Sequence, residues 1–183
     1  FVAVLSVIFL HEKLTRTKII ALVLALVGAA LTVGPVSGQF IGAAMAIVAA
    51  LIYSIYIIIG TNVMKHVSAV QSTAVIFASA GAVYGILTFV NGAHFPTGNS
   101  GWLAVLGIIF ISTIIPVTTF LIGLERVGPT NAAMLSTIEP IVTVFLATWL
   151  FGDQLLPIVL VGGGLILAAV VLLTRSELRT KEI

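Results

Sequence analysis

The stretch His11-Glu-Lys-Leu-Thr-Arg-Thr-Lys18 separates two apolar segments and carries three of the eight lysines and arginines in the chain. Seven apolar stretches follow one another along the sequence, and the gaps between them alternate between basic and free of Lys and Arg. The gaps at 34–38, 91–101 and 152–157 contain neither residue. The remaining cations all lie in alternate gaps or after the last stretch: Lys65, Arg126, Arg175, Arg179 and Lys181.

This alternation predicts a protein that crosses a membrane repeatedly, with all its cations on one face, here called the basic side. Cytoplasmic loops are enriched in Lys and Arg, so the basic side and the C-terminus are expected in the cytoplasm. We expect a multi-pass protein of a cell membrane, the inner membrane in a bacterium.

The composition agrees with a membrane protein and excludes several other classes. Hydrophobic residues make up 60% of the chain and charged residues 8%, with a mean hydropathy of +1.28; soluble domains carry roughly 25% charged residues. The net charge of +2 follows from the loops, and we expect no nucleic-acid partner. The chain has no cysteine, which excludes disulfides and thiolate metal sites.

The fold class expected is an all-α polytopic membrane protein with antiparallel transmembrane helices. Most apolar stretches have the roughly 20 residues that a helix needs to cross a bilayer, whereas residues 1–10 are too few. About seven spans are therefore present, the first truncated, and the chain is expected to be the C-terminal part of a longer protein. The predicted helices are 1–10, 18–34, 39–61, 69–91, 102–123, 130–151 and 156–174.

An internal repeat relates the start of the chain to the segment that begins at Val142. Each copy is an apolar helix, an acidic turn and a second helix rich in small residues. The acidic turns fall on opposite sides of the membrane, so the two copies are inverted, as in many secondary transporters. An ungapped offset of 141 residues aligns Glu12 with Asp153, Leu14 with Leu155, Ala21 with Gly162, Leu24 with Leu165 and Gly28 with Ala169.

Two motifs resemble the drug/metabolite transporter superfamily, EamA type. They are Phe9-Leu-His-Glu-Lys-Leu-Thr15 with Gly28, and Ile138-Glu-Pro-Ile141 followed by Trp149-Leu-Phe-Gly-Asp-Gln-Leu155. The chain departs from the family pattern at Asp153, where Glu is commoner, and at His11, where the family has Gly.

The resemblance implies two inverted repeats of five helices, of which this chain holds one end and one whole copy. Residues 1–34 are then the end of helix four with helix five, residues 39–174 are helices six to ten, and residues 175–183 are a cytoplasmic tail. Four motif residues are expected to be structural, the two acids because a carboxylate near a helix N-terminus can cap free N–H groups: Glu12, Asp153, Gly28 and Gly162.

Glu139 is the one ionisable residue well inside a predicted span. A carboxylate at membrane depth is costly and usually marks a transport path or proton relay. Pro140 removes a helical hydrogen bond and can free a carbonyl beside the carboxylate. Ser136 and Thr143 share the same face of the helix. The alternative is a protonated Glu139 satisfied by a hydroxyl on a neighbouring helix.

Two further groups complete the candidate substrate site, because the resemblance implies that their helices line a central cavity. Each hydroxyl has an alternative role, since Ser and Thr in membrane helices often donate to a carbonyl of their own helix. The groups are Ser112, Thr113, Pro116 and Thr119 in the fifth apolar stretch, and Tyr53 and Tyr56 in the third.

The sequence therefore predicts a carrier that moves small organic metabolites or drugs by alternating access. A membrane channel and a seven-helix receptor are the alternatives. No histidine lies inside a span, and neither HExxH nor GxSxG occurs, so we expect no enzyme activity, catalytic residue, cofactor or metal. The expected partners are the lipid bilayer and a small-molecule substrate, with protons as a candidate coupling ion.

Overall fold

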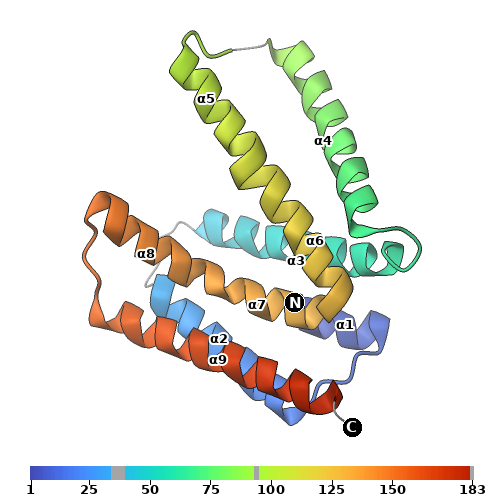
Figure 1. Ribbon diagram of the computed structural model, residues 1–183, viewed down its shortest axis with the longest axis vertical. Helices are drawn as coiled ribbons and strands as arrows, with labels where there is room; N and C mark the ends of the chain where they lie inside the picture. Colours follow the sequence, from blue (N-terminus) through green and yellow to red (C-terminus); the bar gives the residue numbers. More distant parts are fainter. Residues whose placement is uncertain (34–39, 93–94, 182–183) are drawn as a thin grey trace. The chain divides into compact units, whose positions relative to one another are not determined.

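The computed structural model describes residues 1–33, 40–92 and 95–181, and throughout these ranges its regular structure is helical (Figure 1). The gap at 34–38 lies outside them. Within them, five helical segments are long and apolar enough to cross a membrane: Phe40–Val63, Ala69–Asn91, Asn99–Val127, Pro129–Phe151 and Pro157–Ser176. Large apolar side chains cover their outer surfaces, as lipid contact requires. The chain is a polytopic all-α membrane protein.

The helices follow the hydropathy pattern closely. The last one extends beyond the predicted end at Thr174 to Lys181, because no Gly or Pro interrupts the segment that follows. In chain order the elements are α1 (Val2–Leu10), α2 (Arg16–Val33), α3 (Phe40–Val63), α4 (Ala69–Asn91), α5 (Asn99–Gly107), the π-helical η1 (Ile108–Ile114), α6 (Ile115–Val127), α7 (Pro129–Leu135), the 3₁₀-helical η2 (Ser136–Ile138), α8 (Glu139–Phe151) and α9 (Pro157–Lys181).

The chain forms two compact parts, and each is described by itself. The first part comprises residues 1–58 and 129–183, and the second comprises residues 59–128. In the second part α4 packs on α6. The N-terminus of α4 is closed by a capping box of Ser68 and Gln71, and the Ala69 N–H donates to Glu125 Oε2 at 3.2 Å.

In the first part α2 and α9 lie side by side and antiparallel (Figure 1). Their contact is unusually close at two glycines. A Cβ added to Gly28 would lie 2.6 Å from the Gly162 carbonyl oxygen, and one added to Gly162 would lie 2.6 Å from the Gly28 carbonyl oxygen. Small residues therefore let the two backbones touch. The buried positions share one spacing, which is 21, 25, 28 and 32 on α2 and 162, 166, 169 and 173 on α9.

The remaining core of the first part lies where α7 meets this pair. Met134 of α7 packs in one cluster with Ala21 and Ala25 of α2 and with Ala169 and Leu173 of α9. The short helix α1 packs mainly on α7, and its buried residues are Val2, Ala3 and Ser6. The cluster thus joins α7 to both long helices.

Helix boundaries repeat at the offset found in the sequence. Leu10 ends α1 and Phe151 ends α8, 141 positions apart; Arg16 begins α2 and Pro157 begins α9, again 141 apart. The residues that terminate α1 and α8 both adopt the left-handed conformation, His11 with φ 54° and Gly152 with φ 74°. Glycine adopts that conformation at little cost, which explains why the family pattern has Gly before the acid of each turn.

Candidate functional site

The span that carries Glu139 is interrupted at this residue. The turn Ser136–Ile138 is 3₁₀-helical, and α8 restarts at Glu139 with Pro140 in its first turn. Pro140 has no N–H, and its ring clashes with the carbonyl four residues earlier in a regular helix. The Glu139 N–H instead donates to the Ser136 carbonyl in the tighter pattern. The helix is interrupted at Pro140 by a local 3₁₀ turn, but the expectation of a freed carbonyl beside Glu139 is wrong for Ser136, whose carbonyl accepts from the Glu139 N–H.

The hydroxyls beside Glu139 take the alternative role foreseen for them. Ser136 Oγ donates to the Ala132 carbonyl at 3.0 Å, and Thr143 Oγ1 donates to the Glu139 carbonyl at 3.0 Å. Such bonds satisfy hydroxyl groups inside their own helix. Ser136, Glu139 and Thr143 are nevertheless exposed on the surface of the first part, so each side chain is accessible.

Tyr53 and Tyr56 lie next to each other on α3, with ring centroids 5.9 Å apart and ring planes tilted by 31°. Half of the Tyr53 surface is exposed. The structure places the tyrosine pair and Glu139 in the same compact part.

The other four candidates belong to the second part, around a π-helical turn that the sequence pattern did not predict. Pro116 follows η1, whose backbone hydrogen bonds span five residues, as in the bond from the Ile115 N–H to the Phe110 carbonyl. The side chain of Thr113 also donates five residues back, from its Oγ1 to the Ile108 carbonyl at 2.9 Å. π-helical turns of this kind are frequent at functional sites. Ser112, Pro116 and Thr119 are exposed and Thr113 is partly buried.

The ten candidate residues therefore fall into two sets. Six lie in the first part and four in the second, and each set includes one proline that follows an irregular turn. The sets are Tyr53, Tyr56, Ser136, Glu139, Pro140 and Thr143, and Ser112, Thr113, Pro116 and Thr119.

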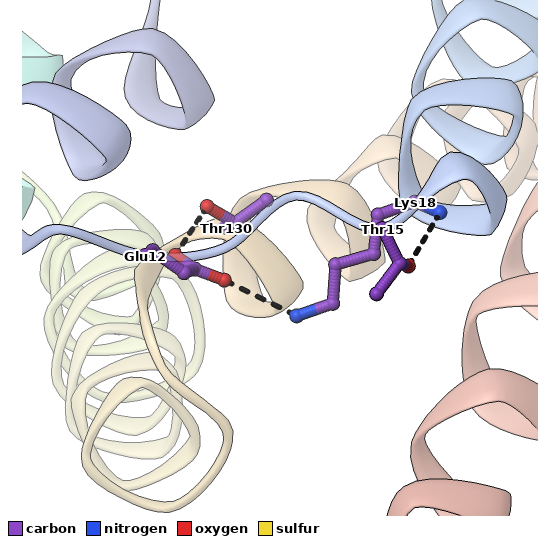
Figure 2. A network of polar contacts seen from close by, with 4 residues as sticks. All are labelled: Glu12, Thr15, Lys18 and Thr130. Atoms are coloured by element: carbon purple, nitrogen blue, oxygen red, sulfur yellow. Dashed lines mark hydrogen bonds and ion pairs between the residues drawn. The ribbon is translucent and has the colours of Figure 1, made fainter.

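Glu12 makes a contact that differs from the expected cap on α2. Its Oε2 accepts a hydrogen bond from Thr130 Oγ1 at 2.6 Å, and its Oε1 pairs with Lys18 Nζ at 3.2 Å (Figure 2). The cap on α2 comes from Thr15, whose Oγ1 accepts from the Lys18 N–H at 3.3 Å. Thr130 was not singled out from the sequence, and no local signal marks it, because the bond joins residues 118 positions apart.

The acid of the second turn is in a different setting. Asp153 is exposed, and the residue that corresponds to Lys18 at the offset of 141 is the apolar Val159. Across the described residues no three His, Asp or Glu side chains come together as a metal site requires.

A pocket of about 290 Å³ lies in the first part between α2, α8 and α9. Among the described residues that line it, all are apolar except Thr32, which carries a hydroxyl group. None of the ten candidate residues lines it. The described part of this lining does not supply the convergent polar groups that fix the orientation of a small ligand.

The EamA-like transporter family matches the chain over residues 40–175. The chain belongs to this family. It is 25% identical over 134 residues to "Uncharacterized transporter YcbK" of Bacillus subtilis, covering 69% of this chain and 42% of that protein. It is 29% identical over 179 residues to an "Uncharacterized transporter" of Archaeoglobus fulgidus, covering 96% of this chain and 63% of that protein.

The chain thus spans about half the length of the curated relatives it matches. No solved structure matches it significantly.

Proposed function

We propose that this chain is part of a carrier that moves small organic metabolites across a cell membrane by alternating access. The observation that carries the proposal is the break in the span Pro129–Phe151 at Glu139, midway along its length. Interrupted helices with a carboxylate at membrane depth form the substrate and ion sites of many secondary transporters.

An inverted repeat supports the alternating movement. The offset of 141 residues relates the ends of α1 and α8, the starts of α2 and α9, and the buried positions on α2 and α9. A contact that pairs equivalent surfaces of two copies has the form expected at a two-fold axis. We infer that residues 1–34 and 39–174 belong to two inverted five-helix repeats, which move against each other around a central cavity.

The chemistry beside Glu139 favours a substrate with an amine. A carboxylate attracts an ammonium group, and the faces of Tyr53 and Tyr56 attract cations as well. Proton coupling fits the same residue, because a carboxylate at membrane depth can be neutralised by either a proton or the substrate. We propose export of amino-acid-like or drug-like amines in exchange for protons, with the basic side and the C-terminus in the cytoplasm.

Transport by the complete protein in liposomes tests this proposal. The probes are a panel of ¹⁴C-labelled amino acids and small organic amines, measured with and without the unlabelled compound inside the vesicles. A carrier accumulates label transiently by counterflow, whereas a channel gives no counterflow. Absence of counterflow for every transported member of the panel would replace the carrier by a channel.

Glu139→Gln separates the role of the carboxylate from that of the fold. We expect the substitution to abolish the dependence of uptake on a pH gradient while the protein still folds. Asp153→Asn is the matched control, because Asp153 is an exposed turn residue. Uptake by the Asp153→Asn variant should equal uptake by the unmodified protein. Unchanged pH dependence in Glu139→Gln would remove Glu139 from the mechanism.

A further inference from the structure

Two helix contacts in the first part differ in their chemistry, and the difference points to which of them moves. We propose that α1 and α7 separate and rejoin during transport while α2 and α9 stay together, and that the hydrogen bond from Thr130 to Glu12 latches the movable contact. This inference rests on the proposed carrier function and assigns its gate.

The contact between α2 and α9 has the properties of a fixed joint. The Gly28 and Gly162 backbones touch, and the Thr32 hydroxyl bonds to the Gly28 carbonyl of its own helix at 2.8 Å. Among the described residues of this contact the buried polar side chain is Thr32, whose hydroxyl already has an acceptor, so separating the helices would gain little hydration while the close backbone contacts would be lost. In a bilayer, association of this kind depends on packing that falls off steeply with distance.

The contact between α1 and α7 has the opposite character. Ser6 on α1 is fully buried, and its hydroxyl has no hydrogen-bond partner in the part of the chain that the structure describes. Thr130 on α7 is 1% exposed. A buried hydroxyl without a partner is costly, and water would satisfy it when the helices separate. When this contact opens, water can hydrate the Ser6 hydroxyl, and the free energy gained offsets part of the packing free energy that is lost.

Glu12 is positioned to hold this contact closed. Glu12 lies in the turn after α1, where His11 has the left-handed conformation that ends the helix. From this turn the Glu12 carboxylate contacts Thr130 at the start of α7. The bond is charge-assisted, and Lys18 holds the second oxygen of the same carboxylate (Figure 2). The Glu12 side chain is 20% exposed, so water can reach the bond and replace it when the contact opens.

Thiol labelling tests the inference without requiring a known substrate. The chain has no cysteine, so Ser6→Cys and Ala25→Cys place one thiol in each contact, both at buried positions. The complete protein carrying either change is treated in liposomes with N-ethylmaleimide, which needs water and a thiolate to react. Labelling is then compared with and without Glu12→Gln, and with Thr130→Val.

We expect Glu12→Gln and Thr130→Val each to raise the labelling rate of Ser6→Cys by about tenfold, the shift that loss of a hydrogen bond to a charged group allows. Labelling of Ala25→Cys should not change. Thr130→Ser keeps the hydroxyl and should leave the rate of Ser6→Cys unchanged, which separates the latch from a general loosening. Equal increases at both thiols, or no increase at Ser6→Cys, would overturn the proposal.

The counterflow experiment, and not the labelling experiment, would show failure of the proposed function. If the protein is a channel, or if its substrate is not an amine, the counterflow experiment fails while the labelling difference between the two contacts remains. If the latch is absent, counterflow remains and the labelling difference is lost.

Discussion

The α2–α9 contact and the α1–α7 contact lie in the same compact part but are held together by different interactions. In the first, Gly28 and Gly162 bring two backbones together along a face of small and apolar side chains. In the second, Thr130 and Glu12 hold two elements through one short hydrogen bond beside a buried serine hydroxyl. Close packing resists any separation, whereas a polar contact can exchange its partners for water. Side-chain chemistry can therefore distinguish a helix contact that stays closed, such as α2–α9, from one that can open, such as α1–α7.

The largest effect is expected from adding one methyl group to the joint. In Gly162→Ala the new Cβ would lie 2.5 Å from Thr32 Oγ1 and 2.6 Å from the Gly28 carbonyl oxygen. The helices must move apart, and we expect the free energy of unfolding to fall by about 1–3 kcal/mol. The measurement is denaturant unfolding in detergent micelles.

Gly164→Ala is the matched control for this change. Gly164 is two residues further along α9, and a Cβ there meets no atom within 4 Å. We expect no loss of stability. If both alanine variants were destabilised equally, the close approach of α2 and α9 would not be the cause.

Removing the latch hydroxyl should have the next largest effect. Thr130→Val keeps the shape of the side chain but leaves Glu12 Oε2 without its donor, and we expect a loss of about 1–3 kcal/mol in the free energy of unfolding. Thr130→Ser should restore most of it. A double-mutant cycle with Glu12→Gln checks the pairing, and additive losses would contradict it.

A gain in stability is expected at the turn that presents Glu12. His11 has φ 54°, a conformation that costs a residue with a Cβ roughly 1–2 kcal/mol and glycine little. His11→Gly should therefore raise the free energy of unfolding by about 0.5–1 kcal/mol after the greater chain entropy of glycine is counted. His66→Gly, at a histidine without positive φ, should give no gain, and a gain there would show that the backbone of His11 is not the reason.

The smallest effect is expected from the ion pair. Lys18 Nζ lies 3.2 Å from Glu12 Oε1, and the two side chains are 11% and 20% exposed. Desolvation of the two charges offsets most of their attraction, so we expect a net contribution of about 0.2–1 kcal/mol. Lys18→Gln should reduce stability by this amount, and the difference should shrink at high salt. Lys65→Gln is the control, because the partner of Lys65 is the neutral Asn62. If Lys18→Gln lowered the free energy of unfolding as much as Thr130→Val does, the ion pair, and not the hydrogen bond from Thr130, would hold α1 and α7 together.

Much of the fold was predictable from the sequence, because a bilayer imposes a length and a hydropathy on each span. The alternation of cations and the offset of 141 residues predict helix ends close to those observed. The EamA resemblance drawn from two short motifs is confirmed by the match to residues 40–175.

The features that were not predictable depend on tertiary contacts or on subtle backbone choices. The partner of Glu12 lies 118 positions away, and neither periodicity nor a motif identifies a single threonine at that distance. A proline such as Pro116 disturbs a helix, but the π-helical pattern of η1 depends on how the carbonyls before the proline find donors. The substrate roles of the ten candidate residues stay predictions.

Distances across the two contacts test the central claim most directly. Spin labels attached to Val4→Cys with Ser136→Cys report on α1 and on η2, which directly follows α7. Labels on Leu26→Cys with Leu167→Cys report on α2 and α9, and all four positions are exposed. Double electron–electron resonance on the complete protein in liposomes gives both distance distributions, with and without Glu12→Gln. We expect Glu12→Gln to move the α1–α7 distribution to longer distances and to leave a single unchanged α2–α9 distance. An unchanged α1–α7 distribution, or a shift between α2 and α9, would contradict it.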